Sequence, residues 1–173
     1  MAANGSHEDA GRAQPPAPRA VATGGGRPGT ERAQDSRRLG RELAMRAIYA
    51  RDVGLARPLE VLAHLAREED APREAESFAR ELVEGVAGHL AELDRRIAAY
   101  ARNWSLPRLA AVDRSVLRLA VFELFHRSDV PRAVAVDEAV GLADAFGGEE
   151  SARFVNGLLG QLVRDLEAGE PRD

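Results

Sequence analysis

Apolar residues recur at helical spacing along nearly all of the chain that follows residue 36. Ser36 is a favourable N-cap residue, and the first apolar stripe begins directly after it and fades near Gly54. This stripe consists of Leu39, Leu43, Ala47 and Ile48. No run of alternating apolar and polar residues competes with the helical pattern, so we predict helices rather than strands.

Prolines mark the beginnings of the next helices. Pro58 opens a short helix, and Pro72 opens a longer one whose pattern loosens around Gly85 and Gly88. A separate helix is then expected from Leu90, with Ile97 and Tyr100 on its apolar side, to about Trp104. The middle of the chain therefore contributes three predicted helices.

The segment RLAAVDRSVLRLAVFELF, residues 108–125, is apolar over most of a helical circumference. A helix of this kind is usually surrounded by other helices, so we expect it at the centre of the fold. Ser128 to Pro131 supplies a cap and a first-turn proline for a helix to about Phe146. Gly147–Gly148 is expected to end this helix, and Glu149 begins the last helix. The prediction is an all-α fold of about seven helices.

The two ends of the chain are predicted to be tails. Residues 1–35 contain no Leu, Ile, Phe, Tyr or Trp, so we expect a disordered N-terminal tail that cannot bury enough apolar surface to fold. Residues 36–167 form the predicted helical domain, and residues 168–173 form a short C-terminal tail.

Composition limits the function classes. The chain of 173 residues has no Cys, and all 24 of its Lys and Arg residues are Arg. The formal net charge of -4 excludes a protein that coats nucleic acid by bulk charge, so any RNA binding needs a local basic patch. No apolar run has the roughly 18 residues of a membrane span, and no secretory signal is visible. We expect a soluble, cytoplasmic protein without a membrane partner.

The sequence offers no catalytic or metal-binding motif. His7, His64, His89 and His126 lack the His-x-x-x-His and Glu-x-x-His spacings of metal sites. Many carboxylates stand four residues from an Arg, as in Glu42 with Arg46 and Glu123 with Arg127, and are interpreted as solvated helix faces. No nucleophile elbow, dinucleotide fingerprint or Walker lysine occurs. We therefore predict a protein that is not an enzyme and uses no metal or cofactor.

The strongest chemical signal is a run of arginines. Residues 37–57 carry six Arg against Glu42 and Asp52, and Arg37, Arg38 and Arg41 share one side of the predicted first turns. Cations are unfavourable at a helix N-terminus, whereas phosphate oxygens bind both guanidinium groups and free N–H groups. The cluster is either a solvated face in an Arg-rich protein or a phosphate site, and its chemistry alone does not choose between them.

Three motifs together resemble the NusB family of transcription antitermination factors. They are RRLGRELAMRAIYA, RLAAVDRSVLRLAVFELFHRSDVP and VAVDEAVGLADAFGGEESARFVNGLLGQL, in that order, and the resemblance covers residues 37–166. It implies seven helices in two small bundles. It also implies that the protein, with the ribosomal protein NusE, binds single-stranded boxA RNA of ribosomal RNA leaders. There it would support RNA polymerase in an antitermination complex.

The resemblance also assigns residues to two surfaces. The RNA-binding side comprises Arg37, Arg38, Arg41, Tyr100, Phe146, Glu150, Arg153 and Phe154. The side that binds NusE comprises Tyr49, Asp113, Arg114 and Arg118. Spacing alone favours core positions for Phe146 and Phe154. Glu150 replaces a familiar Asp, and Asn103 stands where a basic residue is expected, which weakens that edge of the RNA surface.

Two rival functions use the same fold. RNA cytosine methyltransferases carry a NusB-like domain, but they need a further cofactor-binding domain and a Cys nucleophile, and this chain has no Cys. The other rival is a helical protein–protein adaptor or homodimer without an RNA role. An RNA-binding factor with three phosphate contacts would bind weakly alone, with a log–log salt slope of roughly −2. It would bind more strongly once NusE completes the surface.

Overall fold

The computed structural model describes residues 28–54, 57–101 and 105–169. Within these ranges it contains α-helices and one short 3-10 helix, and no strand, so the predicted all-α class is confirmed. The elements are α1 (Pro28–Asp52), α2 (Pro58–Glu68), α3 (Arg73–Tyr100), η1 (Leu106–Arg108), α4 (Ala111–His126), α5 (Arg132–Gly147) and α6 (Glu149–Ala168). None of the described helices is long and apolar enough to span a membrane.

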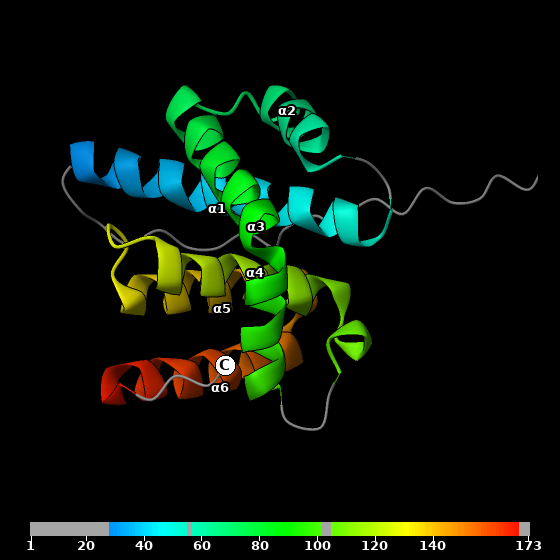
Figure 1. Cartoon of the computed structure of the whole chain (residues 1–173). Coiled ribbons are helices and arrows are strands. Elements are labelled where there is room, and N and C mark those ends of the chain that lie inside the picture. Colours follow the sequence, from blue (N-terminus) through cyan, green and yellow to red (C-terminus); the bar gives the residue numbers. More distant parts are fainter. Residues whose placement is uncertain (1–27, 55–56, 102–104, 170–173) are drawn as a thin grey trace, which may run out of the picture.

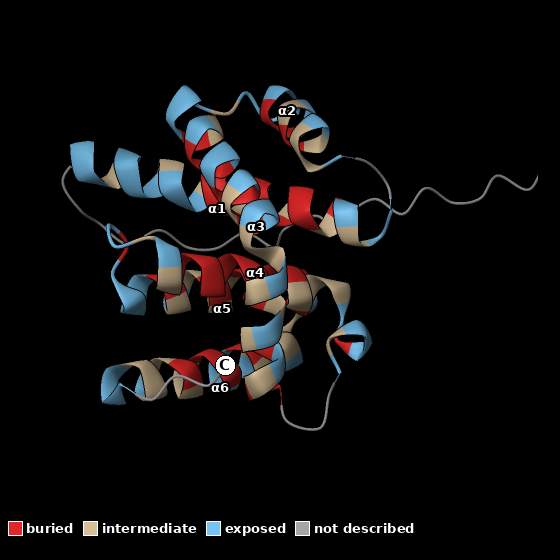
Figure 2. Cartoon of the chain, viewed as in Figure 1, coloured by how far each residue is buried: buried red, intermediate tan, exposed pale blue. Residues whose placement is uncertain are grey.

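The helices form two groups that α3 connects. Helices α1, α2 and the first half of α3 pack together, while α4, α5 and α6 form the second group (Figure 1). Helix α3 crosses both groups, and α4 packs against α1, α3, α5 and α6. The buried faces of the two groups point toward each other around α4 (Figure 2). This arrangement agrees with the two bundles that the family resemblance implies.

Helix α4 is the central helix that its apolar circumference predicted. Residues 115–123 are all buried, including Val116, Leu117 and Val121, which have no exposed surface. Charged Glu123 is buried at the end of this run and needs a compensating partner. The described part of the core therefore centres on one nearly apolar helix.

The first helix begins earlier than predicted. It starts at Pro28, so the boundary of the N-terminal tail at residue 35 is wrong, and Ser36 lies inside the helix rather than at its cap. Residues 32–35 are exposed, so this stretch carries no apolar stripe that the periodicity could have revealed. Pro28 and the acidic first-turn Glu31 are typical of a helix start. Residues 1–27 and 170–173 lie outside the described residues.

A single helix replaces two of the predicted ones. The chain is helical without interruption from Arg73 to Tyr100, so Gly85 and Gly88 do not separate two helices. At Gly85 the reason for glycine is space: an added Cβ would lie 2.0 Å from Cζ of Phe122 on α4. Gly85 therefore lets α4 approach α3 closely. The predicted end of this region at Trp104 lies outside the described residues.

The second group of helices follows its predicted boundaries closely. Helix α5 starts at Arg132 with Pro131 as its N-cap residue, one turn later than a Ser128 cap would place it. Gly148, with a φ of 84°, separates α5 from α6 in a conformation that favours glycine. Glu149 and Glu150 stand in the first turn of α6, as the helix dipole prefers.

The two glycines of α3 provide a matched test of this packing. Gly85→Ala should lower the free energy of unfolding by about 1 to 3 kcal/mol, because the new methyl group overlaps Phe122. In Gly88→Ala the added Cβ has no atom within 4 Å, so this substitution should raise the free energy of unfolding by about 0.5 to 1 kcal/mol through helix propensity. Urea unfolding of both variants measures the two changes. Equal effects would contradict the close approach of α3 and α4.

Candidate nucleic-acid interface

The arginine row lies inside α1 rather than at its N-terminus. Nine residues of helix precede Arg37, which is about two and a half turns. The unpaired N–H groups of the helix start are therefore not available beside these side chains. The predicted contribution of a helix terminus to phosphate binding is wrong, and any anion site here depends on the guanidinium groups alone.

Arg41 is buried, contrary to the prediction of three exposed arginines. Its side chain is 3% exposed and that of Glu123 is 1% exposed. Arg41 donates hydrogen bonds from Nε to both carboxylate oxygens of Glu123 (3.1 and 3.0 Å) and from Nη2 to Oε1 (2.9 Å). Burial raises the pKa of the Glu123 carboxyl, and the hydrogen bond from Arg41 opposes this shift. This pair joins α1 to α4 and leaves Arg41 no surface to offer to RNA.

Arg37 and Arg38 remain at the surface. Their side chains are 45% and 46% exposed. Arg37 Nη2 lies 3.3 Å from Oδ2 of Asp129, and Arg38 Nε lies 4.0 Å from Oε2 of Glu138. Exposed ion pairs of this kind contribute little to stability, so a polyanion can replace the carboxylates at low cost. Two guanidinium groups of the predicted three are therefore accessible.

Phe78 on α3, to which the sequence assigned no role in this site, lies at the centre of this region. Three guanidinium carbons lie near its ring centroid: that of Arg37 at 5.4 Å, and those of Arg41 and Arg127 at 5.3 Å. Arg127 also donates hydrogen bonds to Asp129 and Glu81, which raise the pKa of Arg127. The expected pairing of Arg127 with Glu123 is therefore wrong. No sequence signal connects Phe78 with Arg127, because Phe78 stands on α3 and Arg127 directly follows the end of α4.

An open groove of about 800 Å³ lies beside these arginines. Its lining comes from the first half of α1, the start of α3 and Arg127. The lining charges are mixed: Arg37, Arg73, Arg80 and Arg127 alternate with Glu74, Glu76 and Glu81. The groove therefore offers guanidinium groups to an anion without forming a purely basic channel.

The remaining residues of the predicted RNA side differ in exposure. Tyr100 and Phe146 are buried, and Phe154 is partly buried against the core. Glu150 and Arg153 are exposed, and Arg153 pairs with Glu149. The buried rings of Tyr100 and Phe146 present no open face on which a base could stack. This supports the core positions that spacing alone favoured for Phe146.

Arg38 extends along α5 toward the end of that helix. Its Nε lies 4.0 Å from Glu138, and its Nη2 would lie 3.8 Å from a Cβ added at Gly141, five residues before Phe146. Five helical residues span about 7.5 Å along the axis. The exposed arginines of α1 therefore lie beside α5, whose end leads into the exposed residues of α6.

The second predicted surface contains a tight ion-pair network. Arg118 donates to both oxygens of Asp94 (2.7 and 2.9 Å) and to Asp52 (2.6 Å), and Arg114 donates to the other oxygen of Asp52 (2.6 Å). The carboxylates raise the pKa of Arg118, although burial opposes them with the largest single effect. The network joins α1, α3 and α4. Asp52 and Asp94 were missed because their partners are distant in sequence.

Asp113 does not join this network. It is buried toward the corner between α5 and α6, where it accepts a hydrogen bond from Ser151. Burial raises the pKa of Asp113, and the Ser151 hydrogen bond opposes that shift. Tyr49 is partly buried and packs against the core. Of the four residues predicted to bind a protein partner, Arg114 and Arg118 share the ion-pair network, and Tyr49 stands on α1 three residues before their partner Asp52. Asp113 lies apart from them.

Known proteins resemble this chain over most of its length. The family model described as the NusB family matches residues 38–164. "Transcription antitermination protein NusB" of Symbiobacterium thermophilum is 44% identical over 146 residues, covering 80% of this chain and 95% of that protein. The protein of the same name from Myxococcus xanthus is 47% identical over 132 residues, covering 74% and 94%.

Solved structures give the same likeness. "T. maritima NusB" aligns with a TM-score of 0.69 and 32% identity, covering 79% of this chain and 93% of that one. A chain of the "Crystal Structure of Antitermination Factors NusB and NusE in complex with dsRNA" aligns with a TM-score of 0.67 and 27% identity, covering 73% and 95%.

Arg41 is buried and Arg38 is exposed, so we expect their removal to change the free energy of unfolding by different amounts. Arg41→Ala should lower the free energy of unfolding by roughly 3 to 5 kcal/mol, because it leaves the buried Glu123 carboxylate without a counter-charge. Arg38→Ala also removes one positive charge, but from the surface, and should change the free energy of unfolding by less than about 0.5 kcal/mol. Thermal and urea unfolding of both variants provide the comparison. Similar stabilities would mean that Arg41 is not internally paired.

Proposed function

The chain belongs to the NusB family, and from this membership we propose that it is a cytoplasmic transcription antitermination factor rather than an enzyme. With the ribosomal protein NusE it binds boxA RNA of nascent ribosomal transcripts and supports RNA polymerase within an antitermination complex. The observation that carries the RNA role is the pair of exposed guanidinium groups of Arg37 and Arg38 on a protein of net charge -4.

The RNA strand contacts Arg37 and Arg38 first. Each exchanges a carboxylate contact for a phosphate, and the guanidinium fork suits phosphate oxygens. The strand then extends toward Glu150, Arg153 and the partly buried Phe154 on α6. The bound RNA is single-stranded, because its bases must be unstacked for a protein to distinguish their sequence. The similar solved structure is a complex of NusB and NusE with dsRNA, so duplex RNA is also tested as a ligand.

Arg41, Tyr100 and Phe146 act on RNA only indirectly. Arg41 holds α1 against α4 and so fixes the helix that carries Arg37 and Arg38. With two accessible arginines instead of three, the log–log salt slope expected from these contacts is about −1.4, at roughly −0.7 per contact on single strands. RNA binding by the isolated protein is therefore weak.

NusE binds at the face that carries Tyr49, Arg114 and Arg118. The ion pairs with Asp52 and Asp94 hold both arginines in fixed positions before the partner arrives. A preformed face loses little side-chain entropy on binding, which favours affinity. Asp113 lies apart from these ion pairs, at the corner between α5 and α6. The NusE–protein complex then presents a larger surface to RNA than either partner alone.

A titration with labelled boxA RNA tests the RNA role. The Arg37→Ala/Arg38→Ala variant should bind at least about tenfold more weakly than the wild type, because each lost charge-assisted hydrogen bond is worth about 1.5 to 3 kcal/mol. The matched control is Arg67→Ala/Arg95→Ala, which removes two exposed arginines from α2 and α3. This control should bind as the wild type does.

The titration is run with and without NusE and with scrambled and duplex RNA of the same length. NusE should strengthen binding to boxA and restore only part of the loss in the Arg37/Arg38 variant. Equal affinity of that variant and its control, with NusE still bound by both, would favour a protein adaptor without an RNA role.

A further inference from the structure

Three metal-ligating side chains meet on a part of the protein that neither proposed surface uses. His89 and Glu92 stand one turn apart on α3, and His126 is the last residue of α4. Their ligand atoms all lie within 4.8 Å of one another, and no other group of three or more His, Cys, Asp or Glu residues among the described residues meets this criterion. The spacing along the chain concealed this group, because its members come from two helices.

We propose that His89, Glu92 and His126 form a binding site for a divalent transition-metal ion, with Zn²⁺ as the best match. Two imidazoles and one carboxylate form a donor set that Zn²⁺ favours, and three protein ligands leave a fourth tetrahedral position for water. The side chains of His126 and Glu92 are 26% and 27% exposed, which gives an ion a path from solvent.

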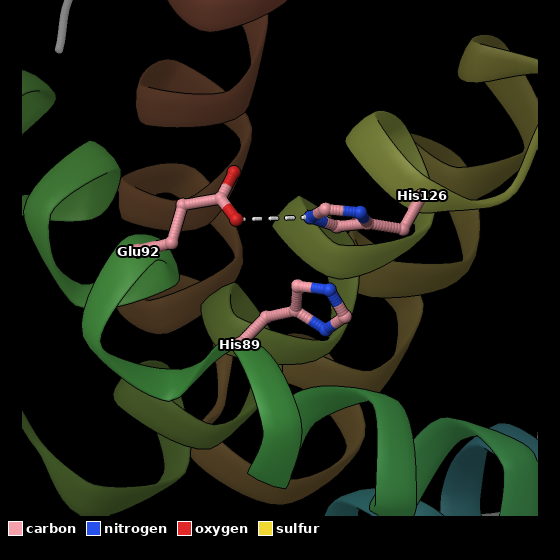
Figure 3. Close-up of side chains that lie close together, drawn as sticks. All are labelled: His89, Glu92 and His126. Atoms are coloured by element: carbon pink, nitrogen blue, oxygen red, sulfur yellow. Dashed lines mark ion pairs between the residues drawn. The ribbon is translucent and has the colours of Figure 1, made fainter.

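The spacing of the donor atoms suits this ion. His126 Nε2 lies 3.3 Å from Glu92 Oε2. Two ligands of a tetrahedral Zn²⁺ with bonds of about 2.0 to 2.1 Å are also about 3.3 Å apart. Figure 3 shows the His89 ring beside that of His126, with one ring nitrogen turned toward the other two side chains. The ring centroids of His89 and His126 are 4.0 Å apart and the ring planes are tilted by 36°. This is closer than two imidazoles that bind one ion through in-plane lone pairs, so binding requires the His89 ring to turn away from that of His126.

Two of the ligands are held by outer contacts. His89 Nδ1 lies 2.8 Å from the carbonyl oxygen of Gly85. A carbonyl only accepts hydrogen bonds, so Nδ1 carries the proton and Nε2 keeps its lone pair for a metal. Metal-binding histidines are commonly oriented in this way. Arg96 Nε donates to Oε1 of Glu92 at 3.0 Å, which leaves Oε2 directed at His126.

A metal ion would join the two helices that carry its ligands. A single ion that accepts lone pairs from all three side chains would connect α3 to α4.

Zinc binding by the metal-free full-length protein tests the proposal. Competition with a chromophoric chelator at pH 7.5 should show one Zn²⁺ per chain. His89→Asn and His126→Asn should each weaken this binding at least about tenfold, the loss that removal of even an outer-shell partner causes. Co²⁺ in place of Zn²⁺ should give the visible absorption of a tetrahedral site in the wild type and lose it in both variants.

The matched control is His64→Asn. His64 Nε2 also contacts a carboxylate, that of Glu68 at 3.2 Å, but this pair is exposed and belongs to no group of three ligands. The control should bind Zn²⁺ as the wild type does. Circular dichroism of each metal-free variant separates loss of a ligand from loss of fold. Saturating Zn²⁺ should raise the melting temperature of the wild type and of His64→Asn but not of His126→Asn.

Three results would overturn the proposal. The first is the absence of saturable binding near one Zn²⁺ per chain. The second is unchanged affinity in well-folded His89→Asn and His126→Asn. The third is loss of binding in His64→Asn alone, which would assign the ion to another histidine. None of these results depends on RNA or NusE, so the metal site and the proposed function fail separately.

Discussion

The ion pair between Arg41 and Glu123 fixes the relation between the first helix and the centre of the fold. Both side chains are almost completely buried, and three hydrogen bonds join them. A buried charge is tolerable only when its partner and geometry are correct, so this pair restricts how α1 can lie on α4. Arg37 and Arg38 are exposed, whereas Arg41, about one turn later on the same helix, is buried.

Internal ion pairing is the common way in which this protein uses its arginines. Arg118 and Arg114 share Asp52, Arg127 binds Asp129 and Glu81, and Arg41 binds Glu123. All of these pairs except Arg127–Asp129, which lies within the loop between α4 and α5, connect different helices or a helix with a loop. Arginine suits such sites because its planar guanidinium group can make several directed hydrogen bonds. A count of arginines along the chain therefore overestimates the charge available to RNA, and the exposure of each one has to be known.

The elements with strong apolar patterns were predictable from the sequence. Helix α4 was recognised from its apolar circumference, α2 from Pro58, and the boundary between α5 and α6 from Gly147–Gly148. The start of α1 was not predictable in this way, because an exposed helical segment carries no apolar stripe. Gly85 was misinterpreted as a break, since its role is visible only when Phe122 is placed against it.

The candidate site was predictable only in part, for the same physical reason. Sequence gives residue type and spacing within one helix, so the cluster of Arg37, Arg38 and Arg41 was visible. The inward turn of Arg41 depends on Glu123, a residue 82 positions away. The ring of Phe78 and the carboxylates that hold Arg114 and Arg118 likewise come from other helices. Contacts between helices determine the orientation and burial of these side chains, and such contacts cannot be read from a single sequence.

A double-mutant cycle of Arg41→Met and Glu123→Leu measures the central interaction most directly. Each single variant leaves one buried charge without a partner, whereas the double variant replaces the pair with apolar side chains of similar size. We expect the double variant to be more stable than either single variant, with a coupling free energy of several kcal/mol. Additive losses, with the double variant the least stable of the three, would contradict this expectation.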